Sequence, residues 1–119
     1  MLIFYNRGEN QQPVKDEGIV GEMDRLIVGY APNEASYKAI GEFGSRVAQL
    51  PIEEVNQAYS QISARYPKYA NEIHIGWAWS LSIKGRCPEA LDKIKSISDL
   101  RDPFWINMKN QILKQCQSS

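Results

Sequence analysis

The sequence predicts an all-α fold built from antiparallel helical hairpins, with about six helices. Apolar residues recur at intervals of three and four along most of the chain, which is the pattern of amphipathic helices. Glycine or proline stands wherever such a run stops, as expected at helix ends. Outside a short N-terminal segment, no stretch has the composition of a β-strand. These observations favour helices joined by short loops, an arrangement typical of all-α domains.

The N-terminal half is expected to contain an arm and three helices. Residues 1–15 are interpreted as an arm, because a short apolar run at 2–5 is followed by a polar link, and residues 16–119 as a single helical domain. Gly29 ends the first helix, Asn33 is a good N-cap for the second, Pro51 opens the third and Pro67 ends it. The three helices are expected at about 16–28, 33–49 and 51–66.

The C-terminal half contains the clearest hairpin of the sequence. Gly85 falls where one helix must end, and glycine enters the left-handed cap conformation without steric cost. Apolar stripes on the two helices suggest that Ala90 faces Ala78 or Leu81 across a close crossing. Helices are expected at about 69–84 and 88–98, followed by a last helix that begins at Pro103.

Composition excludes several classes of function. The 14 basic and 14 acidic side chains cancel, so no field of one sign is available to bind nucleic acid or an anionic membrane. No apolar run approaches the roughly 18 residues of a membrane span or the core of a secretion signal. Two cysteines without a CxxC motif, together with one histidine, are too few for a structural metal site, so neither a metal nor a cofactor is expected. The cysteines are expected to be free thiols in a reducing cytosol.

No set of residues has the spacing of an active site, so we do not expect an enzyme. His74 has no nucleophile or acid near it in any known motif. Cys87 stands near a helix N-terminus, which can lower a thiol pKa, but it lacks an identifiable partner residue. Glu53 and Glu54 are adjacent on a helix and therefore do not face each other.

A degenerate repeat with a period of about 34 residues is visible in the C-terminal two thirds of the chain. When the third expected helix is shifted by 35 positions, Glu54 falls on Glu89 and Val55 on Ala90. A helix pair of this period is typical of tetratricopeptide repeats. The second unit resembles such a repeat at Trp77, Ala78, Leu81, Gly85, Ala90, Ile94 and Pro103.

The region 36–116 also resembles the tetratricopeptide-like chaperones of type III secretion needle subunits. The corresponding residues are Gly85, Ala90, Leu91, Asp102, Pro103, Leu113 and Lys114. The resemblance implies a bacterial cytoplasmic chaperone, associated with virulence, that binds an amphipathic helix of the needle subunit together with a small helical co-chaperone and prevents premature polymerisation. The geometry of that family would place an apolar partner-binding groove at Tyr37, Ile40, Gly44, Val47, Ile75, Trp79 and Ile83.

Two alternatives stay open at this point. Trp77 and Trp79 lie about 200° apart around a helix, so they cannot face the same side. If Trp77 packs inside the hairpin, Trp79 faces either the groove or a core covered by the N-terminal helix. The function could also be that of an immunity-type or regulatory protein, which blocks another protein by surface complementarity.

Overall fold

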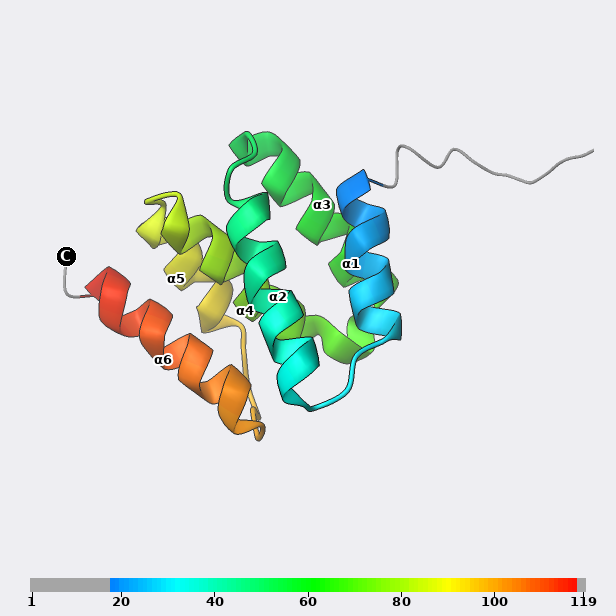
Figure 1. Ribbon diagram of the computed structural model, residues 1–119. Coiled ribbons are helices and arrows are strands. Elements are labelled where there is room, and N and C mark those ends of the chain that lie inside the picture. Colours follow the sequence, from blue (N-terminus) through cyan, green and yellow to red (C-terminus); the bar gives the residue numbers. More distant parts are fainter. Residues whose placement is uncertain (1–17, 118–119) are drawn as a thin grey trace, which may run out of the picture.

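Residues 18–117, which the computed structural model describes, fold into six α-helices without a β-strand (Figure 1). The prediction of an all-α fold with about six helices is confirmed, whereas the tetratricopeptide-like arrangement of the hairpins stays a prediction. The expected arm at 1–15 lies outside the described residues. The helices are α1 (Gly18–Val28), α2 (Glu34–Val47), α3 (Ile52–Arg65), α4 (Ala70–Ile83), α5 (Cys87–Lys95) and α6 (Pro103–Gln117), with a short 3-10 turn, η2 (Pro67–Tyr69), before α4.

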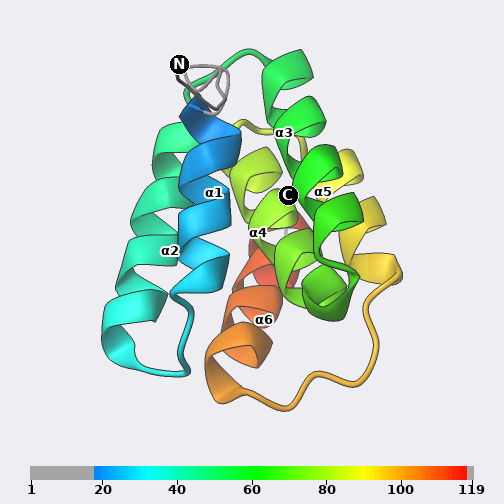
Figure 2. The ribbon, with the colours of Figure 1, turned by 90° about the vertical axis from the view of Figure 1, so that its right-hand side faces the viewer.

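Helix α4 is the centre of the fold. It packs against α2, α3, α5 and α6, and Figure 2 shows it between the pair α1 and α2 on one side and α3 and α5 on the other. Its buried residues lie all around its circumference rather than on one stripe. A helix that is apolar on all sides has to be surrounded by other elements. The sequence of α4 therefore determines its central place.

The turn between α4 and α5 has the cap predicted from Gly85. Gly85 adopts a φ of +80°. The N–H of Arg86 donates to the carbonyl of Leu81 at 2.9 Å, and the N–H of Gly85 donates to that of Ser82 at 3.0 Å. These two bonds form a Schellman motif, which satisfies the last carbonyls of α4. The turn returns the chain along α4, so that α4 and α5 form an antiparallel pair.

The other helix ends agree with the predicted positions to within a few residues. Asn33 caps α2, since its side-chain oxygen accepts from the N–H of Ser36 at 3.0 Å. The largest difference is at α5, which was expected to continue to residue 98 but ends at Lys95. Ile97 is buried just after that end, in a turn in which its N–H donates to Ile94. Ile97 thus reaches the core from the turn that follows α5, so its burial does not require the helix to continue.

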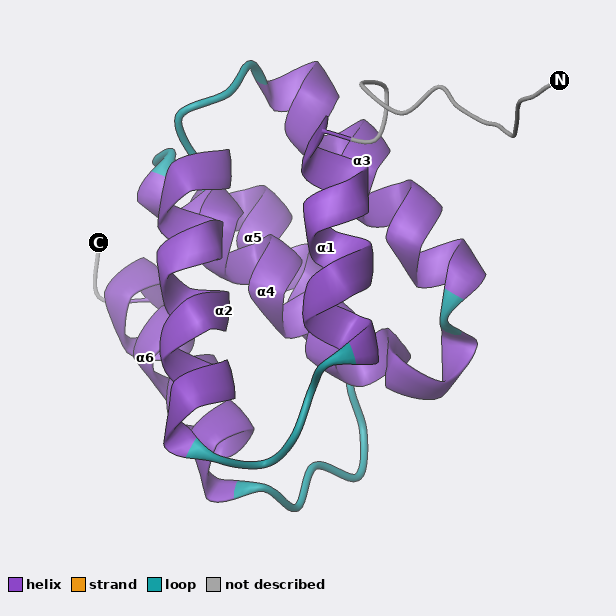
Figure 3. Ribbon diagram, turned by 45° about the vertical axis from the view of Figure 1, so that its right-hand side comes forward, coloured by secondary structure: helices purple, strands orange, loops and turns teal. Residues whose placement is uncertain are grey.

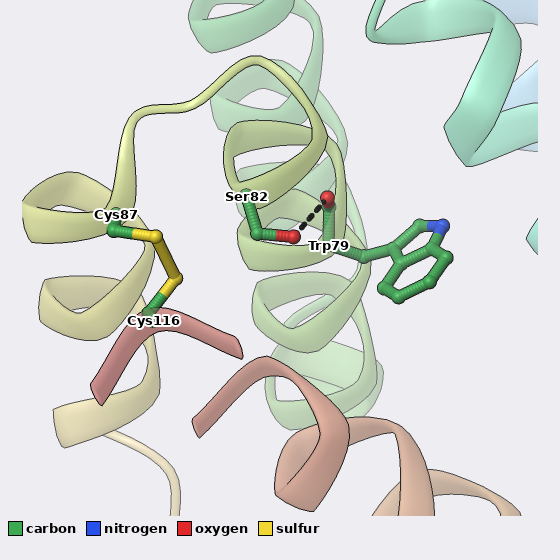
Figure 4. Close-up of a disulfide and its surroundings, with 4 residues drawn as sticks. All are labelled: Trp79, Ser82, Cys87 and Cys116. Atoms are coloured by element: carbon green, nitrogen blue, oxygen red, sulfur yellow. Dashed lines mark hydrogen bonds between the residues drawn. A yellow bond between two sulfur atoms is a disulfide. The ribbon is translucent and has the colours of Figure 1, made fainter. Parts of the chain in front are cut away.

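A disulfide joins Cys87 in the first turn of α5 to Cys116 in the last turn of α6, with the Cα atoms 5.2 Å apart (Figure 4). The expectation of two free thiols is therefore wrong. The loop after α5 reverses the chain, so α6 runs back along α5 and brings its end beside the start of α5. This pairing depends on tertiary packing over 29 residues and leaves no local pattern in the sequence.

None of the helices in the described part of the chain is long and apolar enough to cross a membrane.

Candidate functional site: an apolar cavity under α1

Helix α1 packs against α2 and α3 (Figure 3). It forms one side of an apolar cavity of about 80 Å³ that is partly open to solvent. We call this the α1 cavity. Its roof is formed by α1, its floor by α4, and its walls by α2, α3 and α6. The lining residues are Met23, Leu26, Ile27 and Tyr30 on the α1 side, Ile40 and Phe43 of α2, Tyr59 and Ile62 of α3, Tyr69, Glu72, Ile73, Gly76 and Trp79 along η2 and α4, and Trp105 and Met108 of α6.

The roof is the apolar face of a weak helix. Met23, Leu26 and Ile27 follow the i, i+3, i+4 spacing of an amphipathic helix that faces the cavity. Gly18 and Gly21 each lower helix stability by up to about 1 kcal/mol relative to alanine. No acidic residue stands in the first turn of α1 to interact with the helix dipole. The helix therefore depends on tertiary contacts for its stability.

Two ion pairs hold α1 at its flanks. Glu22 pairs with Arg46 of α2, and hydrogen bonding from Arg46 is the main cause that lowers the pKa of Glu22. On the other side, Asp24 accepts from the Tyr66 hydroxyl and lies 3.4 Å from Arg65 of α3. Both pairs are partly exposed to solvent, where an ion pair contributes about 0–1 kcal/mol. They fix the position of α1 more than they add to its stability.

The floor is a row of α4 residues, Ile73, Gly76 and Trp79, spaced by three. Gly76 stands in the middle of the helix, where glycine costs about 1 kcal/mol relative to alanine. A Cβ atom at this position would lie 3.6 Å from Cε1 of Tyr59, which is an ordinary van der Waals contact. Packing therefore does not require glycine at position 76. The effect of the missing side chain is to leave space in the cavity.

The polar atoms of Tyr30, Tyr59 and Trp105 in the lining have hydrogen-bond partners, whereas the buried indole Nε1 of Trp79 has none within the described residues. The indole N–H of Trp105 donates to the hydroxyl of Tyr30 at 3.1 Å. The hydroxyl of Tyr59 lies 3.0 Å from Oγ of Ser80, and burial raises the pKa of Tyr59 to about 12. Glu72 is the only charged residue among the described residues of the lining. The interior thus offers mainly hydrocarbon surface to a ligand.

Three residues of the predicted groove meet at this site. Ile40 and Trp79 line the α1 cavity. Gly44 lies directly against Trp79, because a Cβ atom on Gly44 would come within 2.7 Å of Cδ1 of the indole ring. The close approach of α2 and α4 at this point requires a residue without a side chain.

The other four residues of the predicted groove lie elsewhere. Val47 and Ile75 are core residues, with 2% and 0% of their surface exposed. Ile83 is 39% exposed at the end of α4. Tyr37 stacks on Phe104, with ring centroids 4.1 Å apart, and its hydroxyl donates to Asp102, which raises its pKa.

The row of Ile75, Trp79 and Ile83 therefore does not form one surface. A spacing of four places residues near one face of a helix, but α4 has buried residues on every side, so the hydrophobicity of its residues did not show which face lies beneath α1. Whether the seven residues bind a partner stays a prediction. The cavity row of Ile73, Gly76 and Trp79 was missed, although a glycine inside an apolar helix is a visible signal.

The two tryptophans point to different sides of α4, as predicted. Trp77 stacks on Tyr59 at 5.8 Å, donates to Asn56 at 2.8 Å and lies under the ammonium group of Lys93 at 3.9 Å. Figure 4 shows Trp79 directed away from the disulfide. Its indole Nε1 is buried and has no hydrogen-bond partner within the described residues. Trp79 is thus both a packing residue against α2 and part of the cavity wall.

No protein-family model matches the chain, and neither does any curated protein or any solved structure. The resemblance to needle-subunit chaperones accordingly rests on the sequence positions given above, and the function has to be argued from the site itself.

Proposed function

We propose that this protein binds an amphipathic helix of a protein partner, and that the partner helix takes the place of α1. The observation that carries this proposal is that α1 covers an apolar cavity whose floor and walls come from other helices. A helix bound in an apolar groove is a common mode of protein recognition, with anchors at i, i+3, i+4 and i+7. The lining residues Met23, Leu26, Ile27 and Tyr30 have this spacing, so the chain itself supplies an example of the ligand.

Helix α1 has the properties of a replaceable occupant. It is 11 residues long, it contains two glycines and its side chains leave part of the cavity unfilled. A partner helix with better helix formers and larger anchors would bury more apolar surface, at about 25 cal/mol for each Å². That gain has to exceed the cost of displacing α1 and of ordering the partner.

The charges beside the cavity define the chemistry of the partner. Arg46 and Arg65 stand on opposite flanks of α1, where Glu22 and Asp24 meet them. A competing helix is expected to carry acidic residues at the same two positions. Ion pairs at the edge of a binding site contribute to specificity and to the rate of association more than to affinity.

The narrower function, a chaperone of a type III secretion needle subunit with a helical co-chaperone, rests on the sequence resemblance alone. The disulfide argues against the bacterial cytoplasm expected with it, because disulfides persist mainly in oxidising compartments. The helix-binding proposal does not depend on the compartment.

A peptide competition experiment tests the proposal. The probe is a labelled synthetic peptide with the sequence of residues 18–31, and the protein carries Met23→Ala to weaken its own α1. We expect saturable binding, together with faster hydrogen exchange of the α1 amides when the peptide is bound. The control peptide has serine in place of Leu26 and Ile27, and it should not bind.

The proposal is wrong if the peptide does not bind and the amides of α1 exchange as slowly as those of α4. Such a result would mean that α1 opens only when the whole protein unfolds and is a permanent part of the core.

A further inference from the structure

We infer that the α1 cavity is a binding site for one small aliphatic group, and that Gly76 keeps this site open. The inference concerns the cavity with α1 in place, and it does not depend on the proposed displacement of α1. The ligand is a free amphiphile whose apolar part is an unbranched or singly branched hydrocarbon chain.

The size of the cavity limits the ligand. About 10–15 Å³ of such space admits one water-sized group, so about 80 Å³ admits roughly five to eight heavy atoms. This is well below the roughly 300–1,000 Å³ of sites for drug-sized ligands. The lining residues of α4 run from Glu72 to Trp79, a rise of about 10 Å along the helix axis. The space is therefore suited to a chain of about six carbon atoms.

The lining favours hydrocarbon over water. A buried water needs two to four polar partners. The indole N–H of Trp105 is bonded to Tyr30, and the hydroxyl of Tyr59 is within hydrogen-bond distance of Ser80, so these groups already have partners. The buried indole N–H of Trp79 has no partner within the described residues, but one donor is too few to hold a water. Glu72 lies at one end of the α4 lining, and the cavity is partly open to solvent, so the polar end of an amphiphilic ligand can stay hydrated.

Gly76 is the residue through which the site can be tested. It stands opposite the ring of Tyr59, and an added methyl group would fit against that ring and occupy part of the cavity. Gly41 of α2 offers a matched control. It also lies inside a helix, a Cβ atom there would have no neighbour within 4 Å, and it is not part of the lining.

The experiment is a titration with primary alcohols from 1-propanol to 1-octanol. The indole N–H signals of Trp79 and Trp105 report binding in NMR spectra, because both rings line the cavity. The proteins compared are the unaltered chain, Gly76→Ala and Gly41→Ala. Both variants should melt higher than the unaltered chain by about 4 °C, since alanine replaces glycine in a helix in each case.

We expect saturable binding whose affinity rises about fourfold for each added methylene and levels off near 1-hexanol. Gly76→Ala should bind 1-hexanol at least fourfold more weakly and reach its plateau at a shorter alcohol. Gly41→Ala should bind like the unaltered chain. A merely structural role for Gly76 would change the melting temperature without shifting the plateau.

The inference is overturned if the indole signals do not saturate, or if Gly76→Ala and Gly41→Ala bind the alcohols equally well. Hydrogen exchange in saturating 1-hexanol is a second test. Protection of the α1 amides that is kept supports a ligand bound beneath α1. Protection that is lost overturns the inference, because the alcohol would then bind to a protein from which α1 has moved.

Discussion

Reduction of the disulfide between Cys87 and Cys116 should destabilise the fold strongly. The two residues are 29 positions apart, and closing a loop of that length removes chain entropy from the unfolded state worth about 3.6 kcal/mol. This is a large share of the 5–15 kcal/mol that holds a typical domain together. For a domain of this size, the loss corresponds to a fall of the melting temperature on the order of 15 °C.

Thermal unfolding followed by circular dichroism, with and without a reductant, measures this effect. The control is the double variant Cys87→Ala, Cys116→Ala, which should melt close to the reduced protein and should not respond to the reductant. Intact mass before and after alkylation establishes whether the thiols are paired in the purified protein. Paired thiols with equal melting temperatures in both states would refute the reasoning that the cross-link stabilises the fold. Two free thiols in protein purified under oxidising conditions would refute the pairing itself.

Three other predictions concern single side chains. Gly85→Ala should destabilise the protein by about 1 kcal/mol in urea unfolding, because alanine is strained at a φ of +80°; an unchanged midpoint would contradict the cap. Gly44→Ala should lower the free energy of unfolding by about 1–3 kcal/mol and alter the fluorescence of Trp79, because the indole ring has to move away from the new methyl group. Unchanged fluorescence and stability would contradict the close approach of α2 and α4. Burial and, secondly, Lys93 lower the pKa of His74 below its ordinary value of 6.5. The unfolded chain then binds this proton more readily than the folded one, so stability should fall as the pH drops through 6.5 towards the folded value, and His74→Asn should remove that part of the slope.

The local features of the fold could be predicted because they depend on neighbouring residues. Asn33 begins a helix because its side-chain oxygen accepts from a backbone N–H, and Gly85 ends one because it adopts a positive φ without steric cost; both caps are found in the structure. The end of α5 was placed too late because Ile97 continues the apolar stripe of the helix. In the structure Ile97 reaches the core from a turn instead, which an apolar stripe cannot reveal.

The site could be predicted only in part because it depends on which elements meet. Trp79 and Ile40 were assigned to the predicted groove from the geometry of the resembled repeat family, and both line the cavity. Ile75 has the same pattern but faces the core. The cysteine pair was missed for a related reason. Its two members meet because α6 returns along α5, and no spacing rule encodes that return.

The energetics of the site give a reason to expect that the cavity is used. Gly76 costs about 1 kcal/mol relative to alanine. The cavity is partly open to solvent, so it costs less than the roughly 2 kcal/mol that a closed void of about 80 Å³ would cost at about 24 cal/mol for each Å³. Natural proteins do tolerate such losses while they remain above a threshold of stability, and Gly41 is an example of a helical glycine that lines nothing. Features that lower stability without serving a function should be scattered over the fold. Here they occur together beneath α1. The floor of the cavity contains both a glycine that packing does not require and the buried indole Nε1 of Trp79. A single substitution at Gly76 would recover part of the lost stability, so the occurrence of these three features together favours a site whose empty space serves binding.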